Sequence, residues 1–251
     1  MDSAEPRQLF APTLEQLEKA FRRLEMRVPP PKRKPWKDSF VFRYVEQTIQ
    51  QAIVQKLART ITGLRAIDVL LERGLFQEQG ILQRTLDEIE EDIVFLSSAI
   101  INNDMTELHR EYLEYFYAEE FDDPADIAAS HSSRGMVRRG KIRAYINKTQ
   151  GSSESRANTV EKILTKAYSG FVHAASPHIM DMCGGEPPRF DVSCEFSGLR
   201  KASQENDALN YFYRALLSMA FGAKALGDEE LFSSIRAAAS QFESRMETIR
   251  Q

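Results

Sequence analysis

The sequence LQRTLDEIEEDIVFLSSAI, residues 82–100, repeats an apolar side chain at alternating steps of four and three residues. These positions are Leu82, Leu86, Ile89, Ile93, Leu96 and Ile100. The spacing places their side chains on one face of an α-helix. The second half of the stretch is apolar on nearly every side, which is typical of a helix near the centre of a bundle. We therefore predict a core helix over residues 76–102 and an all-α fold, a helical bundle.

Two further apolar stripes predict a C-terminal antiparallel helical hairpin. The first stripe consists of Leu209, Phe212, Leu216, Met219 and Ala223, and the second of Ile235, Ala239, Phe242, Met246 and Ile249. Between the two stripes, the sequence LGDEE supplies Gly227 as a helix stop and Asp228 as an N-cap for the helix that follows.

The N-terminal part of the chain is predicted to form a helical arm. Thr13 is a suitable N-cap, and the apolar stripe after it consists of Leu14, Leu17, Phe21 and Leu24. The prolines at 29–31 cannot continue this helix. We predict that residues 1–37 form an N-terminal helical arm and a proline-rich linker, and that residues 38–251 form the bundle domain. The first long helix of that domain is expected over about 40–71.

The middle of the chain gives weaker signals. A short acidic helix is expected over 107–121, and turn-like sequence follows over 122–153. A helix is expected over 155–174 and a short helix over 177–183. Residues 184–199 are expected to be irregular, because glycine and proline interrupt them too often for regular structure.

The composition indicates a folded protein without a membrane span. The chain has 251 residues, 42% of them hydrophobic, and a net charge of −4. The first ten residues lack the basic start and apolar run of a signal peptide. The longest strongly apolar run, 93–101, is far shorter than the ~20 residues that cross a bilayer. We expect a cytoplasmic protein whose two cysteines, Cys183 and Cys194, stay reduced.

Histidines gather in the sequence TKAYSGFVHAASPHIMDMCGG, residues 165–185. His173 falls on the polar face of its helix, and His178 falls in the first turn of the short helix that Ser176 and Pro177 begin. Three interpretations stay open: surface or capping residues, a polar catalytic or ligand pocket, and a metal site. The metal site would use His173, His178, Asp181 and Cys183, but their spacing matches no standard zinc framework. We therefore predict no metal and no cofactor.

Two charged segments have similar alternatives. Arg84 and Glu88 are spaced as an i,i+4 pair on the back of the core helix, either as a solvated salt bridge or as the lining of a pocket. The basic run over 134–148 could follow phosphates or lie on a solvated face. The acidic segment over 107–123 could neutralise it. The partner is left open among RNA, another protein and a second copy of the chain.

Arg84 and Glu88, followed later by Tyr168, Ser169 and His173, resemble a group of uncharacterised bacterial helical proteins. These in turn are distantly similar to the HEPN superfamily of helical nucleases and defence proteins. HEPN nucleases typically carry an arginine and a histidine separated by four residues, and this sequence has no such motif. The resemblance implies a helical fold over residues 40–180 and a role in bacterial defence or stress.

Two functions follow from these observations. The first is an interaction or ligand-binding protein without catalysis, because no catalytic motif is present. The second is a metal-independent, HEPN-like ribonuclease. In that mechanism His173 would accept the ribose 2′-hydroxyl proton, and Arg84 or Lys166 would contact the phosphate. We predict that Arg84, Glu88, Tyr168 and His173 share one polar pocket. Lys166 and His178 would contribute to ligand binding.

Overall fold

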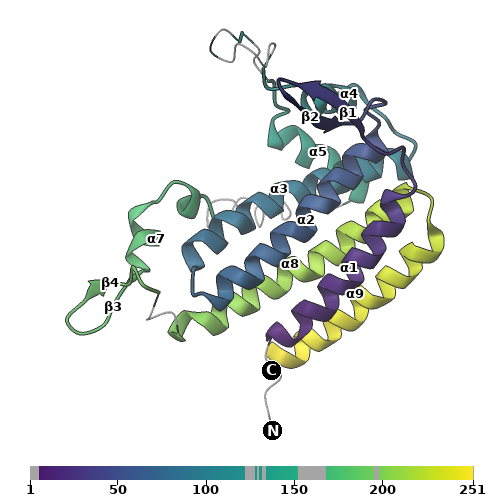
Figure 1. The fold of residues 1–251 in the computed structure, drawn as a ribbon. Helices are drawn as coiled ribbons and strands as arrows, with labels where there is room; N and C mark the ends of the chain where they lie inside the picture. The colour runs from purple at the N-terminus through teal and green to yellow at the C-terminus, as the bar shows by residue number, and fades with distance from the viewer. Residues whose placement is uncertain are drawn as a thin grey trace.

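The computed structural model describes residues 6–121, 128, 130–131, 134–151, 168–194 and 198–250, and it confirms the all-α bundle. Long helices lie side by side along one direction (Figure 1). They are α1 (Phe10–Glu25), α2 (Ile49–Glu72), α3 (Phe76–Ile101), α8 (Gly198–Ala225) and α9 (Glu229–Arg250). Helix α8 packs against α9, α3, α2 and α1, so it lies at the centre of the bundle.

Helix α3 has the predicted bounds to within one residue, and its apolar stripe is in the core. Leu86, Ile93 and Leu96 are fully buried. On the other side of α3, the ring of Phe95 stacks on His109 with centroids 4.0 Å apart and meets Tyr145 edge-on. The expectation that α3 becomes buried on nearly every side is therefore confirmed over its second half.

The C-terminal hairpin of α8 and α9 is confirmed, and both predicted stripes are buried except for a partly exposed Ile249. Gly227 has a φ of 72°, a conformation that glycine adopts without steric cost. Asp228 then accepts a hydrogen bond from the backbone N–H of Leu231 at 3.1 Å. The turn is thus built by the two residues that the sequence assigns to it.

Helix α1 forms, but it begins at Phe10, so the expected N-cap Thr13 lies inside it, where its hydroxyl donates to the backbone carbonyl of Leu9. A 3₁₀ turn, η1 (Pro6–Leu9), precedes the helix. Its apolar stripe does not stand apart from the bundle, because it is buried in the same core. The rings of Phe10 and Phe212 are stacked with centroids 4.1 Å apart. Arg23 donates two hydrogen bonds of 2.6 Å to Asp228 at the α8–α9 turn. Residues 10–25 are therefore an integral helix of the bundle.

The linker and the expected helix start near Phe40 need correction. Residues 32–43 form an antiparallel hairpin of β1 (Lys32–Trp36) and β2 (Ser39–Arg43), and α2 begins only at Ile49. Thr48 and Gln51 form a capping box at that start. Aromatic and β-branched residues at 36 and 40–42 favour a strand, and this preference outweighs the weak helical periodicity there.

The remaining described elements cover the two ends of the bundle (Figure 1). They are α4 (Glu107–Tyr117), α5 (Arg139–Gln150), α7 (Ser176–Met180), β3 (Cys183–Gly184) and β4 (Arg189–Phe190). Helix α5 packs on α3, although the turn-like residues around it predict no helix there. The small strands β3 and β4 fall in the range expected to be irregular. No helix within the described ranges is long and apolar enough to cross a membrane.

Candidate functional site

A run of acidic side chains surrounds the middle of α3. The run consists of Asp87, Glu88, Glu90, Glu91 and Asp92. Successive residues of a helix point about 100° apart, so these carboxylates face different neighbours. Basic side chains from α2, α5 and α8 meet them. Helix α3, which is apolar one turn later, thus carries a buried ionic layer at its centre.

Asp92 is the most densely bonded of these acids, and its side chain is only 1% exposed. It accepts hydrogen bonds from Lys56 at 2.7 Å, from Arg139 at 2.6 Å and from the Tyr112 hydroxyl at 2.7 Å. Burial acts to raise the pKa of Asp92, but the bonds and charges of Arg139 and Lys56 outweigh it and lower the pKa below its ordinary value. Asp92 is therefore a fully partnered anion that ties α2, α4 and α5 to α3.

Arg214 of α8 holds the acids on the opposite side of α3. One Nη atom lies 2.6 Å from Asp87 and the other 2.8 Å from Glu90. The Glu90 side chain is 4% exposed. Burial raises the pKa of Glu90 to about 8, although the charge of Arg214 acts in the other direction. Glu90 therefore holds its proton to a higher pH than an exposed glutamate does.

Glu91 and Arg143 face each other on the α5 side of the same region. The Arg143 Nε and Nη2 atoms donate to one oxygen of Glu91, Oε1, at 3.1 and 2.9 Å. The other oxygen, Oε2, lies 3.7 Å from Nη1 of Arg139, beyond hydrogen-bonding distance. Both side chains of the Glu91–Arg143 pair are 15% exposed.

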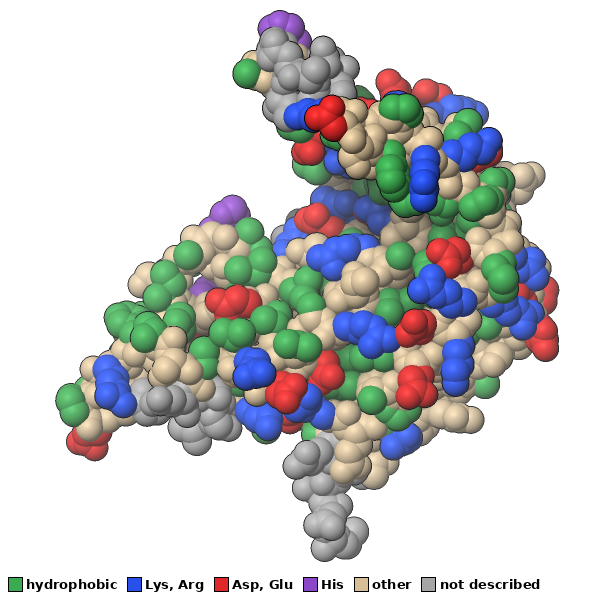
Figure 2. Space-filling model, in the orientation of Figure 1, with side chains coloured by type: hydrophobic (Ala, Val, Ile, Leu, Met, Phe, Trp, Pro, Cys, Tyr) green, Lys and Arg blue, Asp and Glu red, His purple; other side chains and the backbone are tan. Residues whose placement is uncertain are grey.

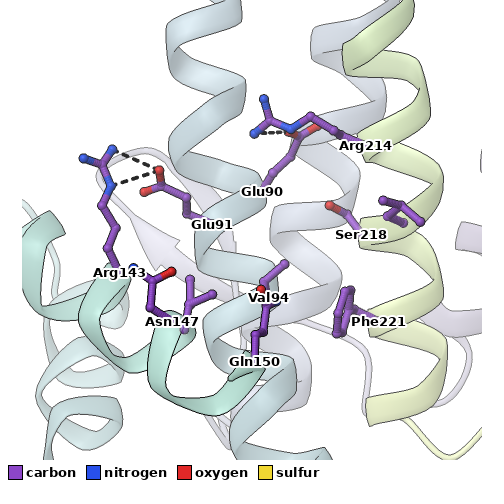
Figure 3. A pocket seen from close by; sticks show the side chains of 11 residues that line it. Glu90, Glu91, Val94, Arg143, Asn147, Gln150, Arg214, Ser218 and Phe221 are labelled. Carbon is purple, nitrogen blue, oxygen red and sulfur yellow. Dashed lines mark hydrogen bonds and ion pairs between the residues drawn. The ribbon is translucent and has the colours of Figure 1, made fainter. Parts of the chain in front are cut away.

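A pocket of about 320 Å³ opens between α3, α5 and α8 at these two pairs (Figure 3). Its residues are Glu90, Glu91, Val94, Arg143, Ile146, Asn147, Gln150, Arg214, Leu217, Ser218 and Phe221. Figure 3 shows the Glu90–Arg214 pair on the α8 side and the Glu91–Arg143 pair on the α5 side. The rest of the wall consists of apolar side chains together with the polar Asn147, Gln150 and Ser218. The pocket therefore has one ionic end, and its remainder is partly apolar.

The ionic end has spare hydrogen-bond acceptors. Oε1 of Glu90 and Oε2 of Glu91 are both buried, and neither accepts a hydrogen bond from any residue that the structure describes. Buried polar atoms in native proteins are nearly always hydrogen-bonded. Two of the acids that line the pocket thus carry a buried oxygen with unused hydrogen-bonding capacity.

The predicted pair of Arg84 and Glu88 is present on α3 but does not line this pocket. Arg84 Nη2 lies 2.6 Å from Glu88 Oε1, with side chains 16% and 38% exposed. Glu88 also lies 3.9 Å from Arg139. The pair is thus partly buried, at the border of the ionic layer.

The predicted residues near the histidine cluster have different surroundings. Tyr168 lies beside Tyr211 of α8, with ring centroids 6.3 Å apart, and burial raises its pKa to about 12. His173 is exposed, and within the described ranges no hydrogen bond or ion pair joins it to Arg84 or Glu88. Lys166 lies outside the described residues.

His178 packs between the two short helical segments of this region. Its ring meets Phe171 edge-on, with centroids 4.5 Å apart, and fills the space beside Gly170 where a Cβ atom would collide with it. The ring of Phe171 in turn fills the space beside Gly80 of α3. These contacts give His178 a packing role, which makes the expected role in ligand binding a separate, untested prediction.

The residues that form the pocket were mostly missed from the sequence, although one signal could have found Glu90. Glu90 follows Leu86 by four residues and precedes Ile93 by three, so it borders the apolar stripe of α3. An acid at that position must be buried. Arg143 and Arg214 carry no comparable signal, because their partners lie 52 and 127 residues away.

No group of three or more histidine, cysteine, aspartate or glutamate side chains within the described ranges is arranged to hold a metal ion. Cys183 and Cys194 are free thiols. Comparison with known proteins finds no matching family, no matching curated protein and no matching solved structure. The resemblance to the HEPN superfamily and the ribonuclease mechanism therefore stay predictions.

Proposed function

We propose that this protein binds a small amphipathic amine in the pocket between α3, α5 and α8. The observation that carries the proposal is the pair of buried acceptor oxygens, Glu90 Oε1 and Glu91 Oε2, that receive no hydrogen bond from the described residues. A primary ammonium group has three donors and no acceptor, so it suits oxygens that lack a hydrogen-bond donor.

An anionic ligand fits the pocket less well. Both guanidinium groups at its ionic end already pair with carboxylates, Arg143 with Glu91 and Arg214 with Asp87 and Glu90. An anion would have to displace one of these carboxylates and leave it buried without a partner, which is costly. Glu91 Oε2, and Glu90 Oε1 once Glu90 has lost its proton, are hydrogen-bond acceptors, and they favour a ligand that donates hydrogen bonds.

The rest of the wall defines the body of the ligand. Val94, Ile146, Leu217 and Phe221 provide apolar surface, and the volume of about 320 Å³ falls at the lower end of the range for small-molecule sites. A ligand with an ammonium head and an alkyl or aromatic body can bury both parts. Asn147 and Gln150 add polar groups from the α5 side.

Binding of an amine should be linked to the proton on Glu90. This carboxyl has a pKa of about 8 because of its burial, and an ammonium group beside it stabilises the ionised form. Amine binding therefore releases a proton below pH 8. The affinity should rise with pH, by up to tenfold per unit, until Glu90 is ionised near pH 8.

The test is isothermal titration calorimetry of hexylamine and phenethylamine, with hexanol and hexanoate as isosteric controls. Measurements at pH 6, 7 and 8, in buffers of different ionisation enthalpy, report the number of protons released. We expect saturable binding of the amines alone, with proton release at pH 6 and 7. The variant Glu90→Gln should bind more weakly and lose the pH dependence.

Glu88→Gln is the matched control, because it makes the same change two residues away on α3 but outside the pocket lining. It should bind the amines like the wild type. Tighter binding of hexanoate than of hexylamine, or equal binding of amines by the Glu90→Gln variant and the wild type, would refute the proposal.

A further inference from the structure

The β1–β2 hairpin is strongly basic in a protein of negative net charge. Residues 32–43 contain five basic side chains and a single acid, Asp38. Arg43 donates two hydrogen bonds to Glu119, at 2.8 and 2.9 Å, and Lys34 lies 3.7 Å from the same carboxylate. The other three basic residues, Lys32, Arg33 and Lys37, form no ion pair with the residues that the structure describes. These three cations are available to an anionic partner.

One face of the hairpin combines a cation with exposed aromatic rings. The strand register pairs Arg33 with Phe42 and Pro35 with Phe40, so these four side chains share a face. Phe40 and Phe42 are 43% and 54% exposed, and their rings meet edge-on with centroids 5.4 Å apart. The Arg33 guanidinium lies 4.4 Å from the centre of the Phe40 ring. Figure 2 shows hydrophobic and basic side chains together over this end of the molecule.

A second cavity, of about 420 Å³, adjoins the hairpin through Phe42 and Arg43. Tyr44, Phe116 and Tyr117 give it further aromatic surface, and Gln47, Gln55 and Arg134 contribute amide and guanidinium groups. Two acids, Glu119 and Glu120, also line it. These acids disfavour a phosphate inside the cavity, whereas a neutral aromatic ring with polar edges suits the mixture of rings and amides.

We propose that the hairpin and this cavity bind single-stranded nucleic acid. One base enters the aromatic cavity, which Phe42 lines, a neighbouring base stacks on the exposed Phe40 ring, and the backbone phosphates lie near Lys32, Arg33 and Lys37. Aromatic platforms beside basic side chains are how proteins bind single strands without sequence preference. A duplex keeps its bases stacked inside and leaves no face free for such a platform.

The charge pattern of the hairpin argues against insertion into a membrane. Its turn, the part that would enter first, consists of the charged residues Lys37 and Asp38. An interfacial membrane element needs apolar side chains at its leading edge. Phe40 and Phe42 are instead on one face of the hairpin, beside Arg33.

The chain provides its own probe for this proposal, because its single tryptophan, Trp36, lies at the end of β1. Titration of the protein with twelve-nucleotide oligo(U) and oligo(dT) should quench Trp36 fluorescence in a saturable manner. Fluorescence anisotropy of labelled oligonucleotides reports the same affinity independently. With three phosphates neutralised, the logarithm of the affinity should fall with the logarithm of salt concentration with a slope of about −2.

The decisive variant is Phe40→Leu/Phe42→Leu, which keeps the apolar character but removes both aromatic faces. It should weaken binding at least about fivefold for each stacked base that is lost. Phe190→Leu is the matched control, since Phe190 is 51% exposed in a different strand, β4. The control should bind like the wild type. Circular dichroism of each variant should match the wild type, because the substituted rings are exposed.

The comparison of oligo(U) with oligo(dT) shows whether the sugar matters, and both should bind because stacking tolerates either. Three results would overturn the proposal. The first is a duplex of the same length that binds as tightly as the single strands. The second is an unchanged affinity of the leucine double variant. The third is quenching of Trp36 by phosphatidylserine vesicles but not by oligonucleotides, which would assign the hairpin to an anionic lipid surface.

Discussion

Replacing Asp92 with alanine is expected to destabilise the bundle strongly. The carboxylate is 1% exposed, and it accepts hydrogen bonds from Lys56, Arg139 and Tyr112. In the variant, the Lys56 ammonium and the Arg139 guanidinium lose their counter-ion, although their side chains are only 17% and 20% exposed. Removal of one partner from a buried ionic group typically costs about 3–5 kcal/mol.

The corresponding change in melting temperature follows from the length of the chain. For a protein of 251 residues, 1 kcal/mol shifts Tm by about 2 °C. The expected loss is therefore about 6–10 °C. Urea unfolding followed by circular dichroism should give the same free energy, with an unchanged dependence on urea concentration if the folded state stays compact.

The pH dependence gives an independent check of the same reasoning. The folded-state pKa of Asp92 is lowered, so its contribution is present above the unfolded value of about 4. That contribution is lost as the pH falls through the lowered folded value. The stability difference between the wild type and Asp92→Ala should therefore be constant from pH 5 to 7 and shrink in stronger acid.

A matched control is Glu107→Ala, which removes the acid of an exposed pair with Arg110. Exposed pairs contribute at most about 1 kcal/mol, so this variant should melt within about 2 °C of the wild type. An Asp92→Ala variant that melts as the control does would refute the reasoning. It would show that Lys56 and Arg139 find water or other partners without loss.

Three further predictions concern α3 and its neighbours. Glu90→Gln should raise the free energy of unfolding above pH 8. The pKa of Glu90 is raised in the folded state, so its contribution to stability is present below about pH 4 and lost as the pH rises through about 8. Urea unfolding at pH 6 and 9 should therefore show a smaller fall in the free energy of unfolding for the variant than for the wild type. Gly80→Ala should destabilise the protein by about 1–3 kcal/mol in a thermal melt, because the new Cβ would lie 2.6–2.9 Å from atoms of the Phe171 ring. Gly140 has open space around it, so the control Gly140→Ala should be neutral or stabilising in the same measurement. Arg84→Ala should cost about 1 kcal/mol or less by urea unfolding, because its partner carboxylate is more than a third exposed, and a loss above 3 kcal/mol would show that the pair is buried more deeply.

The sequence by itself determined the helices that form the core. The apolar stripes of α3, α8 and α9 repeat at the helical period, and the same residues are buried in the structure. The turn between α8 and α9 could also be predicted from the sequence, because Gly227 and Asp228 form it through the backbone conformation of Gly227 and a hydrogen bond from Leu231 to Asp228. Each of these signals depends on neighbours within about four positions, which is the range over which a helix repeats.

The tertiary structure decided the rest. The hairpin at residues 32–43 competes with helix over a short stretch where local preference is weak, and its strands are held by pairing across the turn. Helix α5 shows little apolar periodicity because two of its side chains, Arg139 and Arg143, face the acids of α3. The sequence shows these arginines as a basic run, and only packing shows which carboxylates neutralise them.

The candidate site shows the same division most clearly. The sequence pointed to charged residues on α3 and chose Arg84 and Glu88, whose i,i+4 spacing is a local feature. The pocket instead uses Glu90, whose environment is set by Arg214, more than 120 residues away in the chain. A carboxylate gains a raised pKa and a vacant acceptor only when other helices remove its water and leave one oxygen unbonded. That condition belongs to the packed bundle, because no single segment can exclude water from its own side chains.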